Sequence, residues 1–450
     1  MRPEHCPSLL QRVSMLQKTS STFREWTALG RSTILEDGSF GQWWITWVLP
    51  LIQVFALPAL AAAFAWVIRA ATTGTKTKYP QAEALRTEAL TGFRCLMTLW
   101  VFLVHMCYLA LEGSGSFIVL AGCVLSLSRP KDADGTKAQS RLEPQSFLSF
   151  VAARYLRIMP MFWIASLSVK PWMQGRHEPN ELPTGLGGVL ASCAESFTNV
   201  LTTDPGKVFF GMHPEAEEWF VRTIMVCYVF FPFLEHLILG PPGSDPPSRG
   251  RLFGILGGAI ATKIAIIAVV VSMRAHVGTR WNAYLVELPW LGKTSLYQVP
   301  FLRVPDFAMG AVIPHLADPQ APRWLPICSD CLFLAVVWMS PYSPDFSFFQ
   351  LITDFQIHTP VFAFALWGFC FAGRPSPVGQ LLECYPAWFA KCSYGIYLFH
   401  LPVAMSLGWL WNPQPWNHTM TIFAGAAGLA WVVAVLVEEP IDKFVKAFIR

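Results

Sequence analysis

Charged residues are scarce in this sequence: they make up 14% of its 450 residues, whereas hydrophobic residues make up 53%. Soluble domains carry about 25% charged residues, so the scarcity of charge argues against a soluble enzyme. The high hydrophobic fraction excludes an intrinsically disordered chain. A net charge of +4, spread along the chain, does not form the basic face that a nucleic-acid-binding protein needs. The remaining class is a multi-pass membrane protein, with the lipid bilayer as its first partner.

Common motifs for metals and phosphates are also missing. Most of the eleven cysteines lie in or beside apolar segments, where a thiol behaves as a small hydrophobic group. Cys328 and Cys331 form a single C-x-x-C without a second pair or a nearby histidine, so we expect no zinc site. The sequence has no glycine-rich phosphate loop, zinc-protease helix or serine nucleophile elbow. We therefore expect no metal and no bound cofactor.

Apolar segments suited to crossing a bilayer recur along the chain. They predict an all-α fold, a polytopic membrane helix bundle with about ten core transmembrane helices and one extra N-terminal helix. The core segments are 93–111, 117–127, 150–169, 219–239, 252–273, 299–316, 325–339, 360–371, 388–410 and 421–437.

Three parts of the chain differ in composition. Residues 1–42 are mixed and polar and predict a tail, residues 43–70 predict the extra transmembrane helix, and residues 88–445 predict one membrane domain. The first apolar run begins at residue 43, which is later than a signal peptide would place it. Residues 185–200 fit a re-entrant or an interfacial helix, and the sequence leaves this choice open.

The distribution of Lys and Arg in the loops predicts the orientation of the helices. If residue 93 begins a helix that enters from the cytosol, the loops with most basic residues face the cytosol, and so does the C-terminus. The opposite loops 341–358 and 412–420 contain no Lys or Arg, and Asn417 begins a glycosylation sequon there. The endoplasmic reticulum, the Golgi and the plasma membrane all stay open as the location. The basic residues expected on the cytosolic side include Arg94, Arg154, Arg157, Arg249, Arg251, Lys391 and Lys443.

Arg94 and His105 are the most informative ionisable pair in an apolar segment. Ionisable groups inside a bilayer are costly and mark function by default. The eleven-residue spacing places both on one helix face, with His105 about 16 Å deeper than Arg94. The alternative interpretation is an Arg that reaches the membrane surface and a core His that bonds a neighbouring helix.

Arg154 and Arg157 form a second pair, at i, i+3 on one face of a cytosolic helix end. Two guanidinium groups suit a phosphate-rich ligand, because each can donate two parallel hydrogen bonds. The alternative is that the pair only anchors the helix on its cytosolic side.

Further polar residues lie within the later apolar segments. Ser393, Tyr397 and His400 fall on one helical stripe, which fits either direct chemistry or a polar seam between helices. Arg303 and Asp306 are spaced to pair at i, i+3.

The order of these motifs resembles that of acyltransferase family 3, whose integral membrane proteins acylate sugars, polysaccharides and other acceptors, mostly with acetyl groups. The resemblance spans residues 88–445. The matching positions are Arg94 and His105; Phe117 and Gly122; Arg154, Arg157, Ile158 and Pro160; Trp219, Tyr228 and Pro232; Pro305, Asp306, Phe307 and Gly310; Ser393, Tyr394, Tyr397, Leu398, His400 and Pro402; and Glu438 and Pro440.

The resemblance implies an enzyme that uses acyl-CoA as a co-substrate and a hydroxyl-bearing acceptor on the lumenal or outer side. It implies His105 as the general base or a transient acyl carrier, since an imidazole titrates near neutrality. The implied roles are catalysis for His105 and Arg94; acyl-CoA binding for Arg154 and Arg157; an acceptor cavity of Arg303, Asp306, Ser393, Tyr397 and His400; and structural support from Trp219, Tyr228, Gly310 and Glu438. The acceptor, the acyl length and the oligomeric state stay open.

Three positions depart from the family pattern. Ile224 stands where the family has an acidic residue, Ala121 where it has a serine, and Thr91 where it has an aspartate. These departures keep a non-catalytic relative open as an alternative function. Buried charges and proline-interrupted helices are also features of transporters, so a transporter of a lipid or small solute is the other alternative.

Overall fold

A computed structural model describes the part of the chain that carries the helical domain. The chain divides into two compact units, Met1–Ala63 and Phe64–Arg450, and every described residue lies in the second unit. The predicted tail 1–42, the predicted helix 43–70 and the ambiguous segment 185–200 lie outside the described residues. The described ranges are 87–106, 113–128, 141–177, 218–241, 246–272, 285–288, 292–295, 299–318, 320–322, 324–339, 356–372, 376–407 and 416–448.

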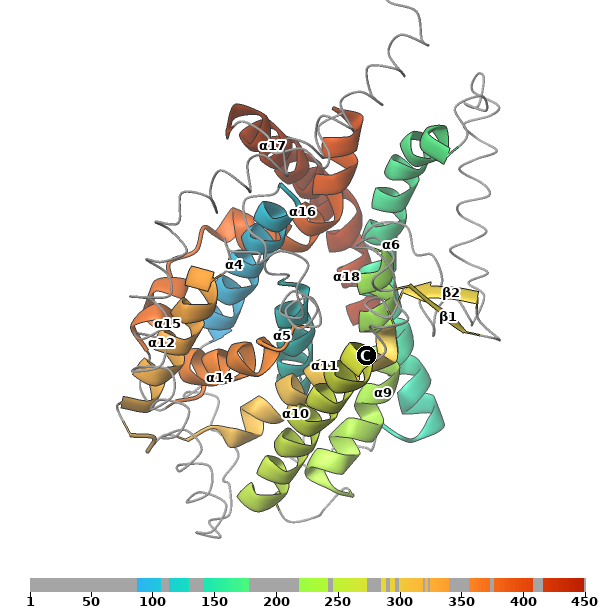
Figure 1. Cartoon of the computed structure of the whole chain (residues 1–450). Helices are drawn as coiled ribbons and strands as arrows, with labels where there is room; N and C mark the ends of the chain where they lie inside the picture. The colour runs from blue at the N-terminus through green and yellow to red at the C-terminus, as the bar shows by residue number, and fades with distance from the viewer. Residues whose placement is uncertain are drawn as a thin grey trace, which may run out of the picture. The chain divides into compact units, whose positions relative to one another are not determined.

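The described residues are almost entirely helical (Figure 1), which confirms the predicted all-α class. Within the described residues, each predicted core segment lies almost entirely on a helix or on an unbroken run of helices. The segment ends 107–111, 273 and 408–410 lie outside the described residues. The elements are α4 (Thr87–His105), α5 (Ser114–Leu127), α6 (Pro144–His177), α9 (Glu218–Leu239), α10 (Arg249–Ser272), η6 (Pro300–Arg303), α11 (Val304–Val312), η7 (Ile313–Leu316), α12 (Trp324–Met339), α14 (Thr359–Cys370), α15 (Pro377–Leu382), α16 (Ala387–Ser406), α17 (Trp416–Val433), η8 (Ala434–Glu438) and α18 (Glu439–Phe448).

The sequence did not predict a short hairpin in the loop after α10. Its strands β1 (Leu285–Leu288) and β2 (Gly292–Ser295) pair antiparallel. A second difference is the π-helical turn η8, which joins α17 to α18 just before Pro440. A proline has no N–H to continue an α-helical ladder, so a wider turn at this point lets the helix carry on.

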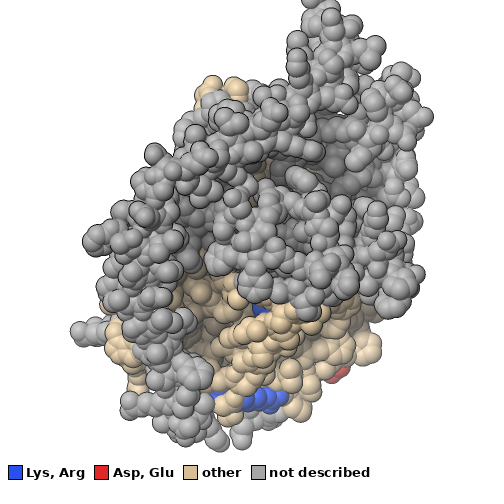
Figure 2. Space-filling view, viewed as in Figure 1, with Lys and Arg blue, Asp and Glu red and all other residues tan. Residues whose placement is uncertain are grey.

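Among the residues that the structure describes, four stretches of helix are long and apolar enough to cross a membrane: Pro144–Ala165, Trp219–Leu239, Arg249–Val269 and Asn417–Phe444. Their outer faces carry large apolar side chains that are more than half exposed, among them Phe233, Ile264 and Leu436. In Figure 2 charged atoms occupy only small patches of the described surface. Such a surface is unfavourable in water and suits lipid, as expected for an integral membrane protein.

The first core helix packs parallel to α16. Arg94 contacts Ala390, Thr98 contacts Ser393, and His105 contacts His400, so residue numbers rise together along both helices. The sequence places the start of both helices on the cytosolic side, which this parallel packing agrees with. Arg94 and His105 both contact α16, as their predicted common face requires.

Helices α5 and α11 approach each other through two glycines. A Cβ atom at Gly310 would lie 1.8 Å from the carbonyl oxygen of Val119, and one at Gly122 would lie 2.2 Å from that of Phe307. Each glycine therefore lies directly against the backbone of the other helix. At both positions a side chain would therefore collide with the backbone of the neighbouring helix.

Substituting Gly310→Ala is expected to lower the unfolding free energy by about 1–3 kcal/mol, because a carbonyl oxygen cannot rotate away as a side chain does. The measurement is the temperature at which half of the detergent-solubilised protein is no longer monodisperse, which falls as the unfolding free energy falls. Gly258→Ala in α10 is the matched control, since an added Cβ there has nothing within 4 Å and alanine favours the helix. Equal destabilisation by the two substitutions would contradict the packing explanation.

Candidate functional site

Two histidines from distant parts of the chain meet between α4 and α16. The Nδ1 atom of His105 lies 2.7 Å from the Nε2 atom of His400. The Nδ1 atom of His400 in turn lies 2.7 Å from the carbonyl oxygen of Tyr397 and 3.2 Å from that of Ile396. His400 is fully buried, whereas His105 is only partly buried. The pair therefore has one ring held in the protein interior and one ring nearer its surface.

Tyr397 connects this histidine pair to aromatic rings of two other helices. The ring centroid of Tyr397 lies 6.2 Å from His400, 5.0 Å from Phe220 and 5.5 Å from Phe117. Phe102 of α4 also meets His400 edge to face, at 5.9 Å. An apolar surround of this kind excludes water and strengthens electrostatic interactions.

A cluster of three buried charged side chains comes from α10, η6 and α11. The predicted pairing of Arg303 with Asp306 is confirmed, at 3.7 Å from Nη1 to Oδ2. The same Oδ2 atom accepts a hydrogen bond of 2.7 Å from Lys263. All three side chains are at most 2% exposed, and the guanidinium of Arg303 lies 5.9 Å from the ring centroid of Trp219.

Lys263 was not among the site residues predicted from the sequence. A signal was available, because Lys263 is the single charged residue of the apolar segment 252–273 and an ionisable residue at that depth indicates a buried partner. Its partner was not identifiable, since Asp306 belongs to a helix 43 residues further along the chain.

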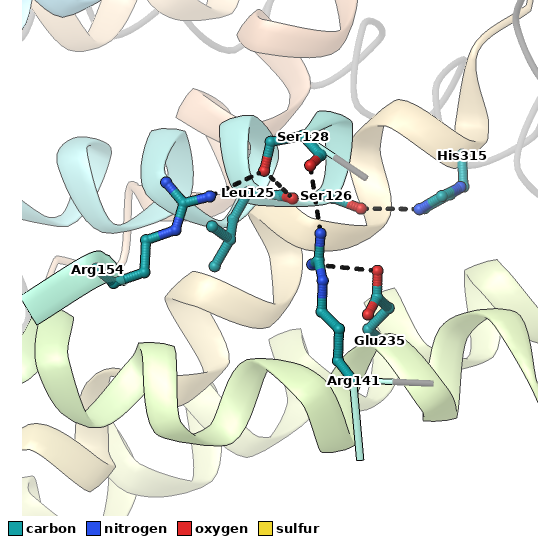
Figure 3. Close-up of polar contacts among 7 residues, drawn as sticks. All are labelled: Leu125, Ser126, Ser128, Arg141, Arg154, Glu235 and His315. Atoms are coloured by element: carbon teal, nitrogen blue, oxygen red, sulfur yellow. Dashed lines mark hydrogen bonds and ion pairs between the residues drawn. The ribbon is translucent and has the colours of Figure 1, made fainter. Parts of the chain in front are cut away.

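Two arginines, Arg141 and Arg154, meet at the end of α5 (Figure 3). Arg154 donates a hydrogen bond of 3.2 Å to the Ser128 hydroxyl, and Arg141 approaches the Ser128 carbonyl at 3.3 Å. Arg141 also pairs with Glu235 at 3.3 Å. Both guanidinium groups lie over the ring of Phe150, at 5.0 Å for Arg141 and 5.6 Å for Arg154. Arg141 is thus a second site residue that sequence reasoning did not select.

Arg157 points to a different partner. Its Nε atom lies 4.0 Å from Asp442 of α18, and this pair is largely exposed. Arg154 and Arg157, which the sequence predicts on one helix face, therefore contact different parts of the chain: the end of α5 and α18. Nearby, Arg94 donates a hydrogen bond of 2.8 Å to the Ala390 carbonyl, and Lys391 pairs with Glu439.

The other predicted site residues are distributed between these groups. Ser393 is 1% exposed and bonds the Ala390 carbonyl at 3.1 Å, on the Arg94 side of α16. Tyr228 packs against Phe307 of α11 at 6.3 Å, and Glu438 ends η8. Ile224, at the position of the family's acidic residue, is 5% exposed. The described residues contain no group of three or more metal-ligating side chains.

The comparisons with known proteins give one match. A family model described as an acyltransferase domain matches residues 87–438, which is most of the chain. Comparison with curated proteins and with solved structures gives no significant match. The matched range begins at the first residue of α4 and ends at the last residue of η8, so it contains both histidines and the buried charge cluster.

Proposed function

Because the chain belongs to acyltransferase family 3, we propose that it transfers an acyl group from acyl-CoA to a hydroxyl group of a sugar, glycan or lipid. The acyl group we favour is acetyl, and the acceptor lies on the lumenal or outer side of the membrane. The observation that carries this proposal is the hydrogen-bonded His105 in an apolar site on the face of α4 that also carries Arg94.

The positions of the basic residues support a donor that enters from the cytosol. Arg94 and His105 are eleven residues apart on one continuous helix, which separates them by about 16 Å along its axis. The extended pantetheine arm of CoA, which separates the phosphates from the thioester, can bridge that length. We propose that Arg154, Arg157 and Arg94 hold the phosphates of acyl-CoA by charge-assisted hydrogen bonds, while the thioester lies beside His105.

The proposed reaction is a direct transfer with His105 as general base. The imidazole takes the proton of the acceptor hydroxyl while the hydroxyl oxygen attacks the thioester carbonyl carbon. The ester C–O bond forms, the C–S bond breaks, and His105 passes the proton to the departing CoA thiolate. Arg94, at the far end of the helix, supports binding of the donor rather than the proton transfer.

The predicted acceptor residues fall into two groups. Tyr397 lies beside His400, within reach of a ligand bound at His105, and Ser393 is one helical turn further toward Arg94. Arg303, which pairs with Asp306, lies 5.9 Å from the ring centroid of Trp219 instead. We propose that Tyr397 borders the acceptor and that the buried charge cluster holds Trp219 and its neighbours in place.

Sealed vesicles that contain the full chain test the proposal. Acetyl-CoA with a labelled acetyl group is supplied on the cytosolic face, and both free CoA and labelled product are followed. We expect CoA release with label recovered as an ester on the opposite side. Vesicles without the protein give the background rate. No release with acetyl-CoA or longer acyl-CoA, from folded protein, would favour the non-catalytic alternative that Ile224 keeps open.

Substituting Arg154→Gln is expected to raise KM for acyl-CoA by about 10- to 100-fold with little change in kcat. A hydrogen bond to a charged group contributes about 1.5–3 kcal/mol, and each 1.4 kcal/mol is tenfold. Arg251→Gln is the matched control, because Arg251 is another basic residue expected on the cytosolic side, on α10. A fall in kcat at unchanged KM would contradict a role in donor binding.

A further inference from the structure

The contact between His105 and His400 has the geometry of an in-plane hydrogen bond. The two nitrogens are 2.7 Å apart, the ring centroids are 4.9 Å apart, and the ring planes differ by 20°. An imidazole nitrogen lies close to the centroid of its own ring. Centroids 4.9 Å apart with nitrogens 2.7 Å apart therefore require both nitrogens to lie between the two centroids and to point at each other. The rings therefore lie edge to edge in nearly one plane, and one of them donates an N–H to the other.

The backbone of α16 decides which ring is the donor. The Nδ1 atom of His400 faces the carbonyl oxygens of Tyr397 and Ile396, and a carbonyl oxygen only accepts hydrogen bonds. Nδ1 of His400 must therefore carry the hydrogen. In a neutral imidazole the other nitrogen then has the lone pair, so Nε2 of His400 accepts and Nδ1 of His105 donates.

The hydrogen bond to His400 also fixes the tautomer of His105. With its hydrogen on Nδ1, the neutral ring carries its lone pair on Nε2. We propose that His400 is a positioning residue that holds His105 in this tautomer, with Nε2 as the basic atom, rather than a wall of the acceptor cavity. This inference rests on the proposed function, because the lone pair matters only if a substrate proton is transferred to it.

His400 has a second effect during the proposed reaction. When Nε2 of His105 takes a proton, the ring becomes an imidazolium ion and its Nδ1–H becomes a charge-assisted donor, which bonds the lone pair of His400 more strongly. The accepting ring is held in an apolar place, since His400 is 0% exposed and Phe102 packs edge to face on it at 5.9 Å. Neutral His400 therefore stabilises the imidazolium of His105 without adding a carboxylate to the apolar core.

Kinetics of two His400 variants test the positioning role. His400→Leu removes the acceptor, and we expect kcat to fall by about 100- to 10,000-fold, the range of a base held in the wrong tautomer, with KM for acyl-CoA unchanged. His400→Gln places an amide oxygen within reach of the Nδ1–H of His105, and we expect it to restore at least a tenth of kcat. His358→Leu is the matched control, because His358 is a second buried histidine and packs edge to face on Phe362. We expect it to keep kcat.

Nitrogen-15 NMR of histidine-labelled protein in bilayers gives a readout that does not depend on turnover. The His105 signals, assigned by their loss in His105→Asn, should show protonation at Nδ1 in the wild type and a mixture of tautomers in His400→Leu. Full kcat in His400→Leu, or protonation at Nε2 in the wild type, would overturn the positioning role alone. Absence of acyl transfer by the wild type would overturn the proposed function and the positioning role with it.

Discussion

Replacing His105 by alanine is expected to lower kcat for acyl transfer by at least about 100-fold, because general bases contribute about 100- to 10,000-fold. His105 is the partly buried member of the histidine pair, and its Nε2 atom is the one to which a substrate proton would pass. The loss should appear equally in kcat and kcat/KM, because proton transfer takes place only in the transition state. The measurement is the initial rate of CoA release from labelled acetyl-CoA in vesicles.

An asparagine at position 105 separates catalysis from structure. Its side-chain amide can donate to His400 from nearly the position of Nδ1, but it offers no basic atom in place of Nε2. We expect His105→Asn to be as inactive as His105→Ala and to match the wild type in thermal stability more closely. Wild-type turnover in His105→Asn would show that the proton is taken by another group, and the assignment of His105 as the base would be wrong.

Asp306→Asn is expected to lower the unfolding free energy by about 3–5 kcal/mol, the usual effect of breaking a buried ion pair. The Oδ2 atom of Asp306 serves two cations, Lys263 at 2.7 Å and Arg303 at 3.7 Å. Asparagine keeps the shape but removes the charge, so both cations lose their shared carboxylate inside the bundle. Steric trapping in bicelles measures the unfolding free energy directly.

Two controls show whether Asp306 is the shared counter-ion. Lys263→Met leaves the ion pair of Arg303 with Asp306 intact, so we expect it to cost less than half as much as Asp306→Asn. Asp442→Asn breaks the exposed pair with Arg157, which is expected to cost about 0–1 kcal/mol. If Lys263→Met were the more damaging change, Arg303 would not depend on the carboxylate of Asp306.

The sequence alone determined the class of fold and most of the helices. Long apolar runs with little charge predict membrane helices, and the described parts of the predicted core segments lie almost entirely on helices. Helical periodicity also placed Arg94 and His105 on one face and brought Arg303 to Asp306. These features are local, because they depend only on the rise and the turn of a single helix.

Only the tertiary structure decided which helices contribute to one site. His105 and His400 are 295 residues apart, and Lys263 and Asp306 are 43 residues apart, so neither pairing follows from spacing. The same limit explains why Arg154 and Arg157, adjacent on α6, contact Ser128 of the α5 end and Asp442 of α18 respectively. Periodicity gives the direction of a side chain around its own helix, but the packing of helices against one another determines what it meets.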